Sequence, residues 1–472
     1  MRRELFIRIL LVLAAGALFL SACAKPTETE TPIPEATELP APQIAVQTQP
    51  SQTEPTAEPE PTATATEPPA PASRYPSEPP ERSRYDFVMT LDYYSHYAKV
   101  QQTIDYLNTT GASLESIPLH IPMYYYADSF REATFAGSQL ETSRNAGNIV
   151  HLELSEPLLP GARTTFTITF TIVVPQREGT YGYTNRQMNL MNWYPYVPAY
   201  EPGTGFIVHE PQVVNNMIVG EYVVNEIADL SVDLTVINRP ELIEVAASAP
   251  MIGELKSGKY RYELELARAF SFSISDSYFI NEIESDGVII QSYSFQNHQE
   301  TGKAVLDIAA NALKLFGDVF YPYPREQLTI VVADFTHNME MDGMVMISYG
   351  VFDFYDGTSK NQLTILAPHE ISHQWFYSLV GNDQALEPWL DESLATYCEL
   401  LYYDRYHPEE VPWWWDMRIH YYEPKGVVDS PITIAGGYVP YRNAVYLKGA
   451  LFLQELRETI GDEAFFGALK DY

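Results

Sequence analysis

Two histidines and a glutamate in the second half of the chain have the types and spacing needed to bind a divalent metal ion. His369, Glu370 and His373 belong to an H-E-x-x-H pentapeptide. Histidines at positions i and i+4 lie one turn apart on the same face of a helix, so both imidazoles can reach one ion. The pentapeptide alone is only suggestive, because a pair of core histidines without a metal has the same pattern.

A third ligand is available shortly after the pentapeptide. Residues 388–397 form a second helical pattern with an acidic first turn, which contains Glu392. Two neutral imidazoles and one carboxylate leave the fourth tetrahedral position open to water, which is the arrangement of a catalytic zinc site. The absence of thiolates also favours zinc over metals that prefer softer ligands. We therefore predict one zinc ion per chain at His369, His373 and Glu392.

These segments resemble a known family. The segment HEISHQWF is followed by WLDESLATY, in which Glu392 is separated from His373 by eighteen residues. This pattern is similar to that of the gluzincin aminopeptidases, the family of aminopeptidase N and leukotriene epoxide hydrolase. The resemblance continues downstream to VYLKGALFLQELRETIGDEAFFGAL and covers most of residues 85–472. It implies His369, His373 and Glu392 as zinc ligands, Glu370 as catalytic base and a thermolysin-like catalytic domain.

Three residues are candidates for roles around the predicted zinc ion. Glu370 points about 100° away from the ligand face and can take a proton from the attacking water. Tyr446 matches the family's catalytic tyrosine, whose phenol would donate to the oxyanion, and Tyr441 is its nearest competitor. Glu399, seven residues after Glu392, lies two turns along the same face. It could orient a ligand histidine from the second coordination sphere, or it could be an ordinary helix carboxylate.

The segment around Glu340 departs from the family's pattern. It lies where the family carries a Gly-Ala-Met-Glu-Asn motif on a strand that pairs with the substrate backbone. Glu340 matches the glutamate that binds the free α-amine of the substrate. However, His337 and Asn338 replace the small residues, and Met341 replaces the asparagine. Peptide binding is therefore expected, and both an aminopeptidase and an endopeptidase remain open.

The N-terminal part of the expected fold is rich in β-strands. Between about residues 83 and 285, apolar residues recur with a period of two, as in residues 163–174, 230–237 and 269–275. Many short amphipathic strands with no helical window between them predict an all-β sandwich or saddle domain.

The pattern changes after Asp286. We expect strands over 287–295, 327–335 and 344–354, a helix over 301–320, and a fourth strand over 361–367. Pro368 suits the first turn of the helix that carries the two histidines, and Gly381 would end it. Residues 286–472 are therefore predicted to form a mixed α/β catalytic domain, so that the chain is multidomain.

The first 82 residues are expected to direct and tether the chain. Residues 1–22 resemble a signal segment, and Leu-Ser-Ala-Cys at 20–23 resembles a bacterial lipobox, in which Cys23 is lipidated. Proline is frequent from residue 24 onward, and few apolar groups are available, so 23–82 is predicted to be a disordered tether. We expect an extracytoplasmic protein held at a membrane by its lipid anchor.

Composition excludes some functions. The formal net charge of −33 over 472 residues argues against nucleic acid as a partner, because the phosphate backbone would be repelled. The sequence predicts a surface-tethered zinc metallopeptidase acting on peptides, most simply an aminopeptidase. The alternatives are an endopeptidase or other small-substrate hydrolase at the same zinc site, or a noncatalytic lipoprotein that binds a partner.

Overall fold

The computed structural model describes residues 80–215, 217–253 and 258–472. The predicted signal segment 1–22, the predicted lipidation site Cys23 and most of the predicted tether lie outside the described residues. Within residues 80–82, which are described, Arg82 forms an ion pair with Asp229 at 2.6 Å. In the part of the chain that the structure describes, no helix is long and apolar enough to span a membrane.

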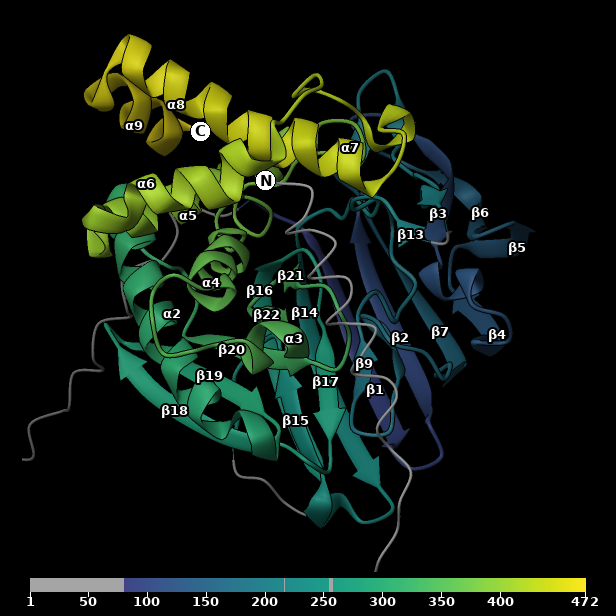
Figure 1. Ribbon diagram of the computed structural model, residues 1–472. Helices are drawn as coiled ribbons and strands as arrows, with labels where there is room; N and C mark the ends of the chain where they lie inside the picture. The colour runs from purple at the N-terminus through teal and green to yellow at the C-terminus, as the bar shows by residue number, and fades with distance from the viewer. Residues whose placement is uncertain (1–79, 216, 254–257) are drawn as a thin grey trace, which may run out of the picture. The chain divides into compact units, whose positions relative to one another are not determined.

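A six-stranded sheet forms the largest part of the β-rich N-terminal region (Figure 1). In spatial order its strands are β16 (Lys259–Ala267), β14 (Ala228–Ile237), β1 (Ser83–Asp92), β2 (Tyr97–Leu107), β7 (Arg163–Val173) and β4 (Phe130–Gly137). Along β7, Phe166, Ile168 and Phe170 are buried and alternate with more exposed threonines. This alternation confirms the period of two expected from the sequence.

Smaller sheets complete this region. The three-stranded sheet contains β3 (Leu114–His120), β6 (Ile149–Leu158) and β5 (Leu140–Ala146). The four-stranded sheet contains β15 (Glu244–Ala247), β17 (Phe272–Ser275), β9 (Met188–Leu190) and β8 (Tyr181–Tyr183). Two short hairpins are β10 (Tyr200–Glu201) with β11 (Gly205–Phe206), and β12 (Val213–Val214) with β13 (Met217–Ile218). Among the described residues of 80–285, the only helices are short 3₁₀ turns at Pro122–Tyr125 and Pro240–Leu242.

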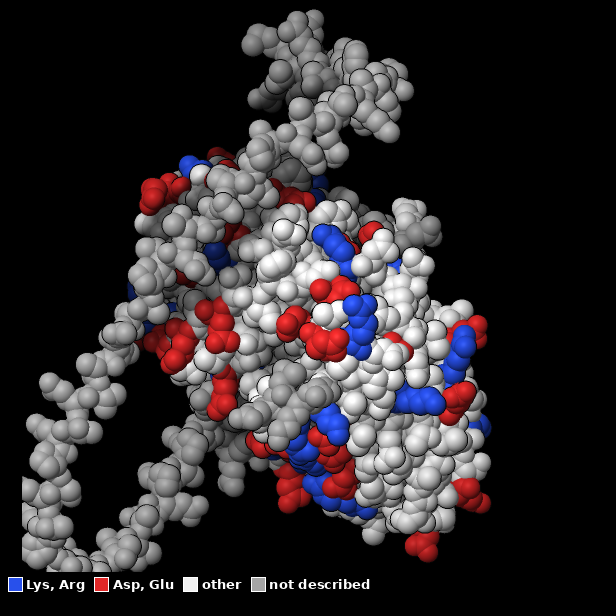
Figure 2. Space-filling view, turned by 90° about the horizontal axis from the view of Figure 1, so that it is seen from below, with Lys and Arg blue, Asp and Glu red and all other residues white. Residues whose placement is uncertain are grey.

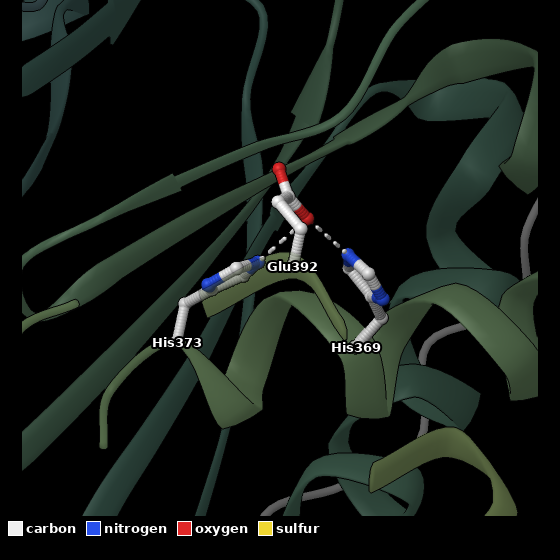
Figure 3. Close-up of side chains that lie close together, drawn as sticks. All are labelled: His369, His373 and Glu392. Carbon is white, nitrogen blue, oxygen red and sulfur yellow. Dashed lines mark hydrogen bonds and ion pairs between the residues drawn. The ribbon is translucent and has the colours of Figure 1, made fainter. Parts of the chain in front are cut away.

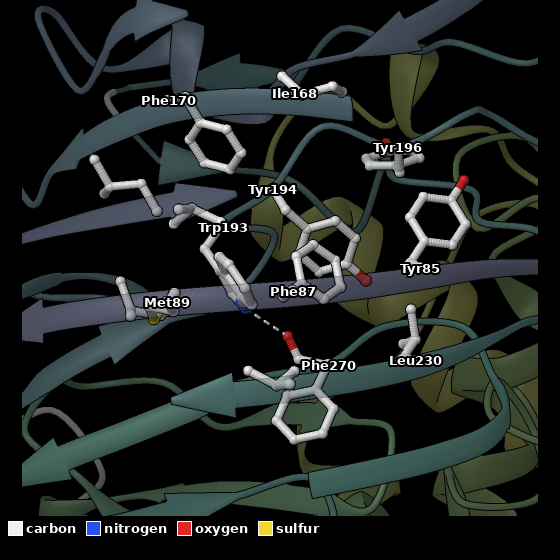
Figure 4. Packing of buried hydrophobic residues seen from close by; sticks show 14 of the residues in the cluster. Tyr85, Phe87, Met89, Ile168, Phe170, Trp193, Tyr194, Tyr196, Leu230 and Phe270 are labelled. Atoms are coloured by element: carbon white, nitrogen blue, oxygen red, sulfur yellow. Dashed lines mark hydrogen bonds between the residues drawn. The ribbon is translucent and has the colours of Figure 1, made fainter. Parts of the chain in front are cut away.

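Aromatic side chains fill the core of the β-rich region (Figure 4). The ring of Phe87 lies 4.9 Å from that of Trp193 and 4.8 Å from that of Tyr194, centroid to centroid. The indole N–H of Trp193 donates to the carbonyl of Phe270 at 2.8 Å. The large rings therefore remove much apolar surface from water without leaving the indole hydrogen-bond donor unpaired.

A five-stranded sheet is the centre of the C-terminal region. Its spatial order is β18 (Phe279–Ser285), β19 (Val288–Ser294), β20 (Gln327–Ala333), β22 (Met344–Ser348) and β21 (Met339–Met341). The inner strands β19, β20 and β22 are parallel, and the two edge strands are antiparallel to their neighbours. Every residue of β20 is buried, as expected for a strand covered on both faces. The strands predicted over 287–295 and 327–335 are confirmed.

Helices cover this sheet in successive layers (Figure 1). α2 (Gln299–Val319) and α4 (Gln362–Ser372) lie against each other, α5 (Trp389–Tyr406) packs on α4, and α8 (Lys448–Ile460) packs on α5. The remaining α-helices of the described residues are α3 (Tyr349–Asp353), α6 (Val411–Trp414), α7 (Tyr438–Arg442) and α9 (Asp462–Asp471). α2 confirms the helix predicted over 301–320.

One predicted strand is wrong, and the strand predicted over 344–354 is right only in its first half, which is β22. Residues 362–367 belong to α4, and the Asn361 side chain caps this helix by accepting a hydrogen bond from the Thr364 N–H at 3.0 Å. Residues 349–353 form α3, which Ser348 caps. Short apolar runs do not distinguish a buried strand from a buried helix, and here the capping side chains decide.

The bounds expected for the histidine-bearing helix are also wrong. Pro368 lies in the middle of α4 rather than in its first turn. The helix ends at Ser372, well before Gly381, and the chain then reverses through a bridge between Phe376 and Val380.

Candidate metal centre

α4 and α5 bring the three predicted zinc ligands together (Figure 3). His369 and His373 extend from α4 toward Glu392, which lies in the first turn of α5. One carboxylate oxygen of Glu392, Oε2, lies 3.2 Å from His369 Nε2 and 3.6 Å from His373 Nε2. All three side chains are buried. A single ion placed among these atoms would be bound by two nitrogens and one oxygen.

The free nitrogen of His373 supports this assignment. Its Nδ1–H donates to the carbonyl of Phe376 at 3.0 Å, so in the neutral imidazole, the form that binds metal ions, Nε2 carries the lone pair. Nε2 is buried and has no hydrogen-bond partner among the described residues. A buried polar atom without a partner is rare because its desolvation is not offset. The residues present therefore fit zinc, whose structural and catalytic sites use these ligand types.

The electrostatics of the cluster also favour a cation. Burial alone would lower the pKa of His369, but its hydrogen bonds with Glu392 and Glu399 raise that pKa to about 9. Burial alone would also lower the pKa of His373, but Glu340 and Glu392 raise it well above its usual value. Burial raises the pKa of Asp391, next to Glu392, to about 8. Carboxylates thus outnumber the positive groups in this buried volume, and a divalent ion would offset the excess.

Glu399, the candidate partner of a ligand histidine, lies next to His369. It is fully buried in α5, and its Oε1 accepts a hydrogen bond from His369 Nδ1 at 2.9 Å. This bond directs the opposite nitrogen of the ring, Nε2, toward the metal position. No pattern in the sequence indicates the groups that hold Glu399, which are the side chains of Trp414 and Arg418.

Glu370 and Tyr446 lie beside the three ligands. Glu370 is buried, and one of its carboxylate oxygens lies within 4.8 Å of ligand atoms of both His373 and Glu340. Burial raises the pKa of Glu370 to about 7, although the two histidines oppose the rise. The hydroxyl of Tyr446 donates to Glu392 Oε1. Its ring is stacked on that of His369, with centroids 5.8 Å apart and planes 6° from parallel.

The competitor Tyr441 lies close to Tyr446 but has different surroundings. Its ring centroid is 5.7 Å from that of Tyr446. It is buried against Gly220, where an added Cβ would lie only 2.8 Å from the tyrosine oxygen. Its hydroxyl has no hydrogen-bond partner among the described residues, whereas that of Tyr446 contacts a predicted ligand. The geometry therefore favours Tyr446 for the role beside the metal.

Glu340 lies on the edge strand β21 and reaches the same cluster. It is buried, and Gln384 Nε2 donates to its Oε1 at 3.3 Å and to Asp391 Oδ2 at 2.9 Å. Gln384 thus separates two carboxylates that would otherwise repel each other. Gln384 was missed by the sequence analysis, since it lies in a loop with no motif.

Glu221 was also missed. It follows the β12–β13 hairpin of the β-rich region, and burial together with Glu340 and Glu392 raises its pKa well above the usual value. Val219 and Tyr441 share one small apolar cluster, which places the segment before Glu221 against the C-terminal helices. Nothing local in the sequence marks this glutamate, because its neighbours in space come from distant segments.

Comparison with known proteins shows what the segment around this site resembles. Residues 304–472 match the model of the peptidase family M1 domain. Aminopeptidase M1-D from Oryza sativa subsp. japonica is 29% identical over 209 residues, which are 41% of this chain and 24% of that protein. Aminopeptidase N from Lactobacillus delbrueckii subsp. lactis is 31% identical over 210 residues, 39% of this chain and 24% of that protein. These matches support the resemblance of this segment to the gluzincin aminopeptidase family.

A similar fold is found among solved structures. The M1 zinc metallopeptidase from Deinococcus radiodurans has a TM-score of 0.55 and 17% sequence identity, over 82% of this chain and 84% of that chain. A mutant of that enzyme bound to a Tyr-Ser-Ala substrate has a TM-score of 0.55 and 18% identity, over 82% of this chain and 85% of that one. At this identity the likeness shows the shared fold. The chain spans about a quarter of the length of the curated relatives it matches.

Proposed function

We propose that this protein is a zinc metallopeptidase of the aminopeptidase type, which releases N-terminal residues from peptides. The observation that carries the proposal is the convergence of His369, His373 and Glu392 on one point, with Glu370 and Tyr446 at its border. The matched relatives are aminopeptidases by name, which supports the same activity.

The residues of the chain divide the chemistry among them. When bound, zinc supplies a Lewis acid that polarises the scissile carbonyl and activates water. Glu370 accepts the proton of the attacking water and returns it to the leaving amine, a role that its raised pKa favours. Tyr446 turns its hydroxyl from Glu392 to the oxyanion that forms on the carbonyl. Glu399 holds the His369 ring in place throughout.

Glu340 is proposed to bind the free amine of the substrate. It is buried beside Glu370 and His373, so an ammonium group at Glu340 would place the first peptide bond of the substrate near the catalytic residues. The departures from the family pattern at His337, Asn338 and Met341 keep an endopeptidase as the second candidate, because they alter the strand that would pair with the substrate.

Aminoacyl and N-acetyl-aminoacyl fluorogenic peptides test the function. We expect hydrolysis of free peptides that is lost with 1,10-phenanthroline and returns on adding zinc, and no hydrolysis of the acetylated peptides. Glu340→Gln should raise KM for free peptides. Equal cleavage of free and acetylated peptides would identify an endopeptidase, and a lack of hydrolysis by the zinc-loaded protein would overturn the enzymatic proposal.

We further propose that the chain is a bacterial lipoprotein, anchored outside the cytoplasm through Cys23. The lipobox-like residues 20–23 and the proline-rich segment after them support this proposal. Expression in a bacterial host with an alkyne-bearing fatty acid should label the full chain but not Cys23→Ser. Equal labelling of both proteins would remove Cys23 as the lipidation site.

A further inference from the structure

Arg418 makes a two-point contact with the carboxylate that orients His369. Its Nε donates to Glu399 Oε2 at 2.8 Å, and its Nη2 donates to Oε1 at 2.7 Å. The side chain of Glu399 is fully buried and that of Arg418 is 13% exposed. Trp414 Nε1 also donates to Glu399 Oε2, at 3.2 Å. With the bond from His369, both oxygens of Glu399 are held by two donors each.

The fork of a guanidinium is what fixes the plane of this carboxylate. Two parallel N–H···O bonds restrain both the position and the rotation of the carboxylate, whereas a single donor leaves it free to turn. Rotation of Glu399 would carry Oε1 away from His369 Nδ1. A buried carboxylate without a positive partner would also be strongly destabilised. Arg418 therefore supplies both the orientation and the charge that Glu399 needs.

Two π-helical turns place side chains around His369. Arg418 lies in the π-helical turn Trp415–Ile419, and Tyr446 lies in a second such turn, Asn443–Leu447. A π-turn contains an extra residue relative to an α-turn, which shifts side chains out of the α-helical register, and such turns are frequent at functional sites. One turn holds His369 through Glu399, and the other stacks a ring on it.

We propose that Arg418 is a positioning residue for the metal ligand His369, and that it acts through Glu399. The inference rests on the proposed zinc site. Arg418 orients Glu399 through its hydrogen bonds, and Glu399 in turn orients the ring of His369. The segment that carries Arg418 is separate from both ligand helices, so the affinity of the site for zinc depends on a part of the chain outside the HExxH motif.

Zinc affinity, measured by chelator competition on the full metal-free chain, tests this role. Partners of ligating histidines typically contribute about 10–100-fold to metal affinity. We expect Arg418→Gln to weaken zinc binding by about 10-fold or more. Arg418→Lys keeps the charge but loses the fork, and should fall between Arg418→Gln and the unmodified protein. In the cobalt-substituted protein, the visible absorption bands should shift in the same order.

A matched control is available on α8. Arg457 makes the same two-point contact, to Asp462 of α9 at 2.8 and 2.9 Å, and its other hydrogen bond goes to the hydroxyl of Tyr397 rather than to Glu399 or a predicted ligand. Arg457→Gln should leave zinc affinity and the cobalt spectrum unchanged.

A double-mutant cycle distinguishes an effect of Arg418 that acts through Glu399 from a general loss of structure. In a Glu399→Gln background, Arg418→Gln should weaken zinc binding no further, because the carboxylate through which Arg418 acts is already absent. Additive losses, or an unchanged zinc affinity in folded Arg418→Gln, would overturn the proposal. If Arg418→Gln does not fold, an unchanged cobalt spectrum in Arg418→Lys would overturn it. Failure of the unmodified protein to bind zinc would overturn the proposed function instead.

Discussion

Buried histidines occur in both regions of the molecule, and they behave in opposite ways. In the β-rich region, His120 is buried between neutral groups: Asn148 donates to its Nε2 at 3.2 Å, and its Nδ1–H donates to the hydroxyl of Tyr196 at 2.6 Å. Burial lowers the pKa of His120 to about 4. At the metal centre, His369 is just as buried, but its carboxylate partners raise its pKa to about 9.

The comparison shows that the acidic partners, rather than burial, mark the metal centre. Desolvation acts in the same direction on both histidines, because it always disfavours the charged form. Only at the metal centre do carboxylates outweigh it. The β-rich region places charged groups on its surface instead, as in the pairs of Arg261 with Asp233 and Glu263. On the face shown in Figure 2, basic side chains likewise lie beside acidic ones.

The largest expected effect is at the catalytic carboxylate. Glu370→Gln keeps the size of the side chain but removes its basicity, so kcat should fall by about 10²–10⁴-fold. Zinc content, measured by mass spectrometry, should be unchanged. His120→Gln, in the other region, should leave kcat near its original value. A folded, zinc-loaded Glu370→Gln protein with near-original kcat would remove Glu370 as the base.

Tyr446→Phe should have a smaller effect on turnover. The variant keeps the ring stacked on His369 but loses the donor to the oxyanion, which is worth about 10²–10³-fold in kcat. KM should change little, because the hydroxyl acts mainly in the transition state. If Tyr441→Phe lowers kcat more than Tyr446→Phe does, the two tyrosines have been assigned in the wrong order.

The depressed pKa of His120 predicts that the β-rich region loses stability as the pH falls. The unfolded state binds this proton below about pH 6.5, and the folded state binds it only near pH 4. Between these values the unfolded state holds more protons, so stability falls as pH falls, by about 3 kcal/mol in total. Urea unfolding at several pH values measures this slope. His120→Gln should reduce it, and an equal slope in both proteins would contradict the buried neutral state.

The smallest effect concerns the contact between the two regions. Gly343, in the turn between β21 and β22, has φ +72°, and an added Cβ would lie 2.0 Å from the Ser248 carbonyl oxygen. Gly343→Ala should therefore destabilise the protein by about 2 kcal/mol. The control is Gly287→Ala, at φ +78° with open space around it, which should cost about 1 kcal/mol. Equal losses of unfolding free energy would show that the Ser248 contact is unimportant.

The sequence indicated the three residues that the structure brings together, but not the groups that surround them. His369, His373 and Glu392 could be predicted because their spacing lies on two helices with regular geometry. Gln384, Glu221 and Arg418 could not, since each reaches the centre from a segment without a periodic pattern.

The same distinction holds for the fold. Alternating strands such as β7 have a period that only a half-buried strand satisfies, so they were predicted correctly. Most residues of the run 362–367 in α4 are buried, so its apolar residues show neither the helical nor the strand period. The cap at Asn361, which decides between helix and strand, is a single side-chain contact.

X-ray absorption at the zinc K-edge of the zinc-loaded protein tests the central claim most directly. The account predicts one zinc per chain with two imidazole nitrogens and one carboxylate oxygen at about 2.0–2.2 Å, together with a light atom from solvent. A sulfur neighbour at about 2.3 Å, or fewer than two imidazoles, would contradict it.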